Sequence, residues 1–252
     1  MQPPDDAPPV QVYDAVKTAF ATLAGAFYRG GEPREGAIPT GKVGFDRALG
    51  GFVPGEIVAL TGPVGSGRTR MACELALGVM ESGTSEDGPR AGVLFATNHA
   101  RAEDVALRLV CAHADLSFST LRAGQLTSEA QSHYFEAASH VAALPLWVDV
   151  RPCDTAATVL QRVEDHAAQF RECRMRLLIV DDWTFGCRAI GDLRAVCQRT
   201  ESAALLVLRD ARQGSIADAH IALRRAKGRL RPVLLHAREA LARPLAWDWR
   251  AV

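Results

Sequence analysis

A glycine-rich stretch lies between an apolar run at 57–61 and a segment with a helical pattern at 71–80. Glycines tolerate positive φ and close backbone approach, so successive N–H groups of such a turn can point inward onto phosphate oxygens, with help from the following helix dipole. The spacing is that of a Walker A motif, except that an arginine replaces its lysine. We therefore expect ATP or ADP to bind at Gly62, Pro63, Gly65, Ser66, Gly67, Arg68 and Thr69.

A second motif ends another apolar run, where Asp181 and Asp182 follow residues 177–180. This is the form of a Walker B motif, in which the first acid orients magnesium or its water. Acids also cap strand ends in many α/β domains, but the phosphate loop upstream favours an Mg²⁺ site made by Thr69 and Asp181. Asp182 is expected to face solvent or to cap a loop.

Composition limits the partners of the chain. The 252 residues carry 29 Lys and Arg and 29 Asp and Glu, so the net charge gives no general attraction to nucleic acid. The six cysteines form no CxxC pair and the amino terminus has no signal-peptide pattern, which predicts a reduced, cytoplasmic protein. No apolar run approaches the length of a membrane span, so no membrane partner is expected.

Apolar runs alternate with helical patterns after residue 40, which predicts an α/β fold with a mostly parallel sheet flanked by helices. The last runs follow one another too closely for helical crossovers, so antiparallel edge strands are expected near the carboxyl terminus. The predicted strands are 57–61, 93–97, 146–150, 177–181, 204–208, 221–223 and 233–236. The predicted helices are 68–82, 101–113, 128–144, 158–172 and 192–200.

The amino-terminal residues 1–37 are expected to stand apart from a nucleotide-binding domain at 38–252. Prolines and aspartates at 1–9 predict disorder, and apolar residues at steps of three and four within 10–28 predict an amphipathic helix. Glycines and prolines at 29–40 are typical of a linker. The helix can pack on its own domain or on a neighbouring subunit, and the pattern leaves both open.

Longer stretches resemble the motor domain of the DnaB-family replicative helicases. The resemblance begins with VGFDRALGGFVPGEIVALTGPVGSGRTRMACELALGVMESG and continues through VLFATNHARAEDVALRLVCAHADLSFSTLRAGQLTSE, PLWVDVRPCDTAATVLQRVEDHA, DAHIALRRAKG, VLLHARE and ARPLAWDW. It implies a RecA-like P-loop NTPase core, the use of ATP and Mg²⁺, a hexameric ring and movement on single-stranded DNA. The leading helix and IPTG at 38–41 resemble the linker that packs on a neighbouring subunit in that family.

Three departures from the family pattern concern ATP hydrolysis and DNA. Where the family carries a glutamate that activates the attacking water, this chain has Asn98, and an amide cannot accept the proton. Arg68 keeps the charge of lysine but not its compact shape. The two loops that hold DNA in the family are shortened, at 184–191 and 209–217. His99 is an alternative base, although a polar residue satisfied at a strand end is the favoured interpretation.

Arginines near the carboxyl terminus suggest two further roles. Arg238 matches the family's arginine that reaches the γ-phosphate held by the next subunit, with an ordinary surface charge as the alternative. The densest basic cluster is a candidate nucleic-acid contact, with a solvated hairpin turn as the alternative. That cluster contains Arg224, Arg225, Lys227, Arg229 and Arg231. The polar groups of the second shortened loop are Arg209, Arg212 and Gln213, for which a solvated turn is favoured over a DNA contact.

Five further histidines show no carboxylate or cysteine partner set that indicates a zinc site. They are His113, His133, His140, His166 and His220, and they are given no role. Trp183, Trp247 and Trp249 are expected to pack in the core or at a sheet edge rather than to stack on bases.

Two functions fit these features. The favoured one is a hydrolysis-impaired nucleotide-binding protein that acts in DNA metabolism by docking to a true helicase or another partner. The alternative is an active, ring-forming, ATP-dependent DNA helicase or translocase. The fold supports both, while Asn98, Arg68 and the shortened loops favour the first.

The amino-terminal helix is expected to make the chain oligomeric by burying its apolar face on another subunit. Mass measurement in solution at tens of micromolar should then show an oligomer for the full chain and a smaller species for a truncated chain that begins at Ile38. If the full chain and the truncated chain are both monomers, the ring is contradicted and the helix belongs to the surface of its own domain.

Overall fold

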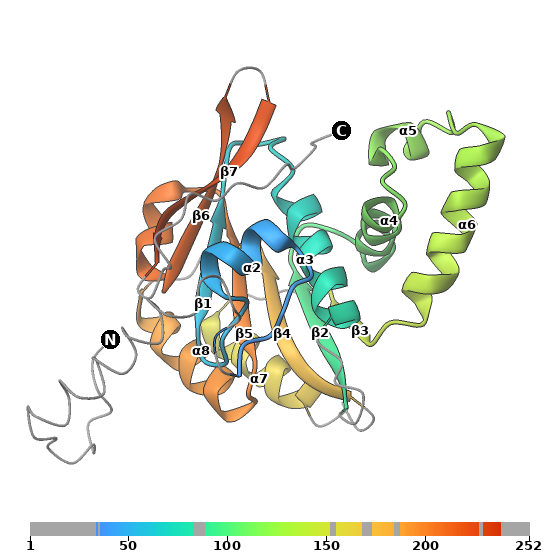
Figure 1. Ribbon diagram of the computed structural model, residues 1–252. Helices are drawn as coiled ribbons and strands as arrows, with labels where there is room; N and C mark the ends of the chain where they lie inside the picture. Colours follow the sequence, from blue (N-terminus) through green and yellow to red (C-terminus); the bar gives the residue numbers. More distant parts are fainter. Residues whose placement is uncertain are drawn as a thin grey trace, which may run out of the picture.

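The structure is a computed structural model, and it describes residues 34, 36–82, 89–151, 155–167, 173–183, 187–226 and 229–237. Within these residues a seven-stranded sheet forms the centre of the fold (Figure 1). The strand order is β3-β2-β4-β5-β1-β6-β7. The strands are β1 (Ile57–Thr61), β2 (Arg90–Thr97), β3 (Leu146–Asp149), β4 (Cys173–Asp181), β5 (Ala203–Leu208), β6 (Ala219–Ala226) and β7 (Arg229–Ala237).

The pairing confirms the predicted sheet and refines its edge. All neighbouring strands from β3 to β6 run parallel, and only β7 is antiparallel, paired with β6. The sequence predicts antiparallel strands at this edge, and β6 is antiparallel to β7 but parallel to β1. The parallel pairing is possible because a short 3₁₀ helix, η1 (Ala211–Ile216), makes the crossover from β5. The β6–β7 hairpin extends beyond the other strands (Figure 1).

Helices cover both faces of the sheet, as predicted. The strands alternate their side chains between two apolar layers, because successive side chains of a strand point to opposite faces. Val58 and Leu60 of β1 pack with α3 and α4, whereas Ile57 and Ala59 pack with α7 and α8. The helices are α2 (Val43–Leu49), α3 (Arg68–Ser82), α4 (Ala102–His113), α5 (Phe118–Arg122), α6 (Ser128–Ala142), α7 (Ala156–Ala167) and α8 (Cys187–Arg199). Among the described residues, no helix is both long and apolar enough to span a bilayer.

The sequence patterns missed three short elements, α2, α5 and η1, because one or two turns give too few residues for a helical period. They also placed the start of α8 five residues late, at Asp192 rather than Cys187. The predicted end of α7 falls at 168–172, outside the described residues.

The last part of the expected linker packs on its own domain. Ile38 is buried and exchanges backbone hydrogen bonds with Phe52 at 2.6 and 2.9 Å. Thr40 is also buried, and its N–H and hydroxyl donate to the Asp46 carboxylate, with Thr40 Oγ1 2.8 Å from Asp46 Oδ1. The predicted helix at 10–28 lies outside the described residues, so the domain division and the docking of that helix stay predictions.

Close contact between this segment and α3 requires a glycine. A Cβ added at Gly78 would lie 1.7 Å from the Thr40 carbonyl oxygen, whose position is fixed by the Asp46 bonds.

We expect Gly78→Ala to lower the free energy of unfolding by about 1–3 kcal/mol through this overlap, measured by urea denaturation. Gly191→Ala in α8 is the matched control, because nothing lies within 4 Å of its added Cβ. It should leave stability unchanged or raise it by up to about 1 kcal/mol, since alanine favours a helix more than glycine does. Equal losses in both variants would contradict the overlap.

Candidate functional site

The glycine-rich loop joins the end of β1 to the start of α3, the connection that the sequence predicts. Gly65 and Gly67 both have φ of +74°, a conformation that other residues rarely adopt. A Cβ added at Gly62 would lie 2.6 Å from Ser66 Oγ. The glycines therefore fix the loop shape that lets backbone N–H groups approach an anion.

Ser66 supplies a side-chain feature that also fits a phosphate. Its Oγ atom is buried and has no hydrogen-bond partner within the part of the chain that the structure describes. A buried hydroxyl without a partner costs free energy unless a ligand or water satisfies it. The loop thus offers a donor in addition to its backbone.

Thr69 and Asp181 meet as the predicted metal pair requires. Thr69 Oγ1 donates to Asp181 Oδ2 at 3.0 Å, which links the start of α3 to the end of β4. Burial raises the pKa of Asp181 above its usual value, and the neighbouring charge of Asp182 adds to this increase. The bond from Thr69 lowers the pKa but does not outweigh burial. A hydroxyl and a carboxylate are hard oxygen ligands that suit Mg²⁺, and a cation here would offset the cost of burying the carboxylate.

Arg68 does not extend as a free cation above the loop. Its Nη1 donates to the carbonyl oxygen of Leu208 at 2.6 Å, at the end of β5 between β1 and β4. The sequence left open whether Arg68 would turn onto Asp181 or Asp182. The guanidinium instead contacts the backbone of the strand that lies between the loop and those acids.

Asp182 corrects the sequence interpretation, which placed it in solvent or at a loop cap. Its side chain is only 8% exposed and forms ion pairs with His99 and Arg209, with His99 Nε2 3.2 Å from Oδ2. A buried carboxylate needs partners of this kind because its charge loses the solvation of water. Arg209, which the sequence assigned to a solvated turn, is one of those partners.

Asn98 directly follows β2 and is exposed. Thr97 pairs in register with Asp181 of β4, so Asn98 lies one residue beyond the level of Asp181 at the same edge of the sheet. The ligands of open parallel α/β sheets bind at this carboxyl edge. The site therefore brings together the glycine-rich loop, the hydrogen-bonded Thr69 and Asp181, and an amide at the position that the resemblance assigns to a general base.

A family model described as the DnaB-like helicase C terminal domain matches residues 37–184. The match covers more than half of the chain and includes the phosphate loop, Asn98 and Asp181. This chain belongs to that family.

Two solved structures share the fold of the chain. One, described as an ATPase domain, has a TM-score of 0.71 at 11% identity, covering 92% of this chain and 93% of the other. A DnaB-like replicative helicase, solved to show its interactions with primase, has a TM-score of 0.74 at 12% identity. That comparison covers 94% of this chain but only 64% of the helicase chain. A comparison with curated protein sequences found no match. The RecA-like fold predicted from the sequence is confirmed.

The DnaB-like core also holds a cavity that the sequence did not reveal. A cavity of about 140 Å³ adjoins the phosphate loop, lined by Gly65 and Gly67 and by residues of α3, α4 and α5. Arg108 lies 4.1 Å from the ring centroid of Phe118 on this wall, and Arg70 lines it as well. No motif marks these arginines, because they are brought together by helix packing rather than by spacing.

Four residues of the basic cluster lie on two paired strands, Arg224 and Arg225 in β6 and Arg229 and Arg231 in β7. Arg224 and Arg231 are exposed and directly opposite each other in the register. The side chains of Arg225 and Arg229, and all of Lys227 and Arg238, lie outside the described residues, as do Trp247 and Trp249. Trp183 is buried in the core, as predicted. Like charges placed opposite each other destabilise a hairpin, so an anionic partner would relieve this arrangement.

A second polar cluster at the carboxyl edge gives His166 a role that the sequence did not. Asp149, which ends β3, accepts from Arg151 Nε at 3.0 Å and lies 3.1 Å from His166 Nε2. Burial raises the pKa of Asp149, but the bonds from Arg151 and His166 and the charge of Arg162 outweigh it and hold the pKa below its usual range. The cluster borders a hollow of about 450 Å³.

The depressed pKa predicts a pH-dependent loss of stability in Asp149→Asn. An acid whose pKa falls on folding stabilises the protein above its unfolded pKa, and this contribution disappears as the pH falls through the folded pKa. Asp149→Asn should therefore cost on the order of 3 kcal/mol at pH 7 and progressively less below about pH 4, measured by urea unfolding. Asp165→Asn at the rim of the same hollow is the control and should change stability by less than about 0.5 kcal/mol. A cost that stays constant from pH 7 to about pH 3 would contradict the assignment.

Proposed function

We propose that this DnaB-like protein binds ATP or ADP with Mg²⁺, hydrolyses ATP poorly, and acts in DNA metabolism by docking to a true helicase or another protein. One observation carries the proposal: the Thr69–Asp181 pair is in place, while Asn98 occupies the edge position where a carboxylate base is required. Binding and hydrolysis depend on different residues, so one can persist without the other.

The residues of the loop fit a nucleotide with its metal. Gly65 and Gly67 hold the backbone open for phosphate oxygens, and Ser66 Oγ is a buried donor still to be satisfied. Thr69 and Asp181 would hold Mg²⁺, which neutralises phosphate charge when bound. Arg68 would have to leave the Leu208 carbonyl to reach a phosphate, which supports weak rather than tight binding.

The amide at position 98 supports slow hydrolysis. A positioned general base contributes about 10²–10⁴ in rate, and the Asn98 side chain lacks the basicity for this role. Among the described residues His99 is the nearest candidate in sequence, and its Nε2 faces Asp182, an arrangement that satisfies both side chains without a ligand. The favoured interpretation of His99 as a satisfied polar residue is consistent with this pair.

A second function rests on the pair formed by His99 and Asp182. A carboxylate that orients an imidazole is also how enzymes hold a histidine base. If His99 accepts the proton through its other nitrogen, the protein is an active, ring-forming DNA helicase or translocase. In that function Arg238 would complete the site of the next subunit, and Arg224, Arg225, Lys227 and Arg229 would contact single-stranded DNA.

Steady-state ATPase assays of Asn98→Glu test the favoured function. The glutamate should restore a base beside the metal pair and raise the rate, by at most about 10²–10⁴ over the unmodified chain. Asn98→Gln is the matched control, because it has the length of glutamate without its basicity, and it should give no gain. Robust DNA-stimulated turnover by the unmodified chain that is lost in His99→Gln would overturn the proposal in favour of an active motor.

Nucleotide titration separates failure to bind from failure to hydrolyse. A fluorescent ATP analogue should bind weakly with Mg²⁺, more tightly to Arg68→Lys, and with no dependence on Mg²⁺ in Asp181→Ala. Lack of saturable binding at millimolar nucleotide would refute nucleotide binding itself, whatever the hydrolysis assays show.

A further inference from the structure

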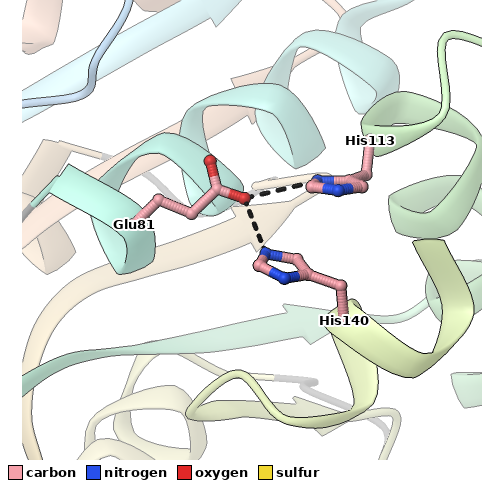
Figure 2. A group of neighbouring side chains, drawn as sticks. All are labelled: Glu81, His113 and His140. Atoms are coloured by element: carbon pink, nitrogen blue, oxygen red, sulfur yellow. Dashed lines mark hydrogen bonds and ion pairs between the residues drawn. The ribbon is translucent and has the colours of Figure 1, made fainter. Parts of the chain in front are cut away.

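Three possible metal ligands from different helices lie close together (Figure 2). His113 Nδ1 lies 3.3 Å and His140 Nε2 lies 3.1 Å from the same oxygen of Glu81. The ligand atoms of all three residues lie within 4.8 Å of one another. The sequence pattern indicated no carboxylate partner for these histidines, because 32 and 27 residues separate the members of the group. We propose that Glu81, His113 and His140 bind one divalent transition-metal ion, with Zn²⁺ as the representative ion.

The spacing of the three side chains suits such an ion. Around a tetrahedral zinc with bonds of about 2.0–2.1 Å, ligand atoms lie about 3.3–3.4 Å apart. The two distances from Glu81 are already close to this value. The imidazole rings stack with their centroids 4.4 Å apart and their planes 19° apart, so both nitrogens reach the carboxylate from one side. Small rotations of these side chains would complete three corners, and water the fourth.

The local electrostatics also favour a cation. Glu81 lies in the last turn of α3, His113 ends α4, and His140 lies in the last turn of α6. Helix C-termini carry partial negative charge, so three of them converge here. A glutamate in the last turn of a helix is unfavourable unless a positive charge accompanies it. Two protonated imidazoles in a stack would repel each other, whereas one metal ion supplies the charge to all three groups.

The ligand set selects the class of ion. Two imidazoles and one carboxylate suit zinc, cobalt, nickel or copper, whereas magnesium and calcium prefer oxygen ligands alone. The three side chains are between 33% and 46% exposed, so an ion can enter from solvent. At a rise of 1.5 Å per residue, Glu81 lies about 18 Å along α3 from Thr69, so this site is separate from the Mg²⁺ pair.

The ion would fasten α6 to the core. Only Ala137 and Val141 of α6 are buried, whereas α3 has an extensive buried face. A metal that joins α3, α4 and α6 would supply a contact that the small apolar interface of α6 lacks. We expect it to stabilise the outer helices rather than to take part in chemistry at the phosphate loop.

Metal titration of the full chain, without a histidine tag and after removal of metal by a chelator, tests the site. We expect one equivalent of Co²⁺ to give a visible absorption band that Zn²⁺ displaces, in the absence of nucleotide. Glu81→Gln, His113→Ala and His140→Ala should each weaken binding at least about 10-fold. His133→Ala, an exposed histidine earlier on α6, is the matched control and should bind as the unmodified chain does.

Thermal unfolding gives a second readout that does not depend on cobalt spectra. Zn²⁺ at about 100 times its Kd should raise the Tm by about 5–10 °C, and Mg²⁺ should not. His113→Ala and His140→Ala should retain the metal-free Tm and lose the rise, which separates loss of the site from loss of folding. No binding at about 100 µM Zn²⁺, a range in which specific protein zinc sites fill, would show that the cluster is a pair of His–Glu ion pairs only. Binding that survives in the double histidine variant would assign the ion to other residues.

Discussion

Coverage of both sheet faces is the constraint on which the rest of the structure depends. All residues of β1 and of its neighbour β5 are buried, as is the run Leu177–Val180 of β4, so the polar side chains of this region gather where these strands end. At that edge the bond from Thr69 to Asp181 joins the start of α3 to β4 across the end of β5. A carboxylate buried there needs the hydroxyl, a cation or a proton. The same bond therefore stabilises the edge and holds together the two oxygen groups that we propose as Mg²⁺ ligands.

The features that hold a phosphate and those that would hydrolyse it differ in kind. Gly65 and Gly67 contribute through backbone conformation, which a change of neighbouring side chain alters little. Hydrolysis instead depends on one side chain of the right basicity, and Asn98 lacks it. The contacts of Asp182 with His99 and Arg209 hold a second, buried carboxylate at this edge. Under the proposed function, Asn98 would therefore affect turnover, whereas Arg68 would affect how tightly the nucleotide is held.

The sequence predicted what depends on neighbours along the chain and missed what depends on packing. The boundaries of β1 and α3 were predicted correctly, because a buried strand, a glycine turn and a long helix each have a strong local pattern. The partners of Asp182 were missed, since Arg209 is 27 residues away and no spacing rule connects them. The Asp149–His166 pair and the Glu81 cluster were missed for the same reason. Short helices such as α5 were missed because they contain too few residues to show a period.

The two proposed ion sites lie at opposite ends of α3, so each would act on different neighbouring elements. α3 begins beside Thr69 and ends at Ser82, next to Glu81, and a helix of this length behaves as a stiff rod. Its inner face, which includes Met71, Leu75 and Met80, is fully buried against the sheet. α6 is the opposite case, with little buried surface. An ion at Glu81 would therefore act mainly on the weakly held partner, because the cost of displacing α3 from the sheet exceeds the cost of repositioning α6. Coupling between the two sites would need α3 itself to take two positions, and its packing opposes that.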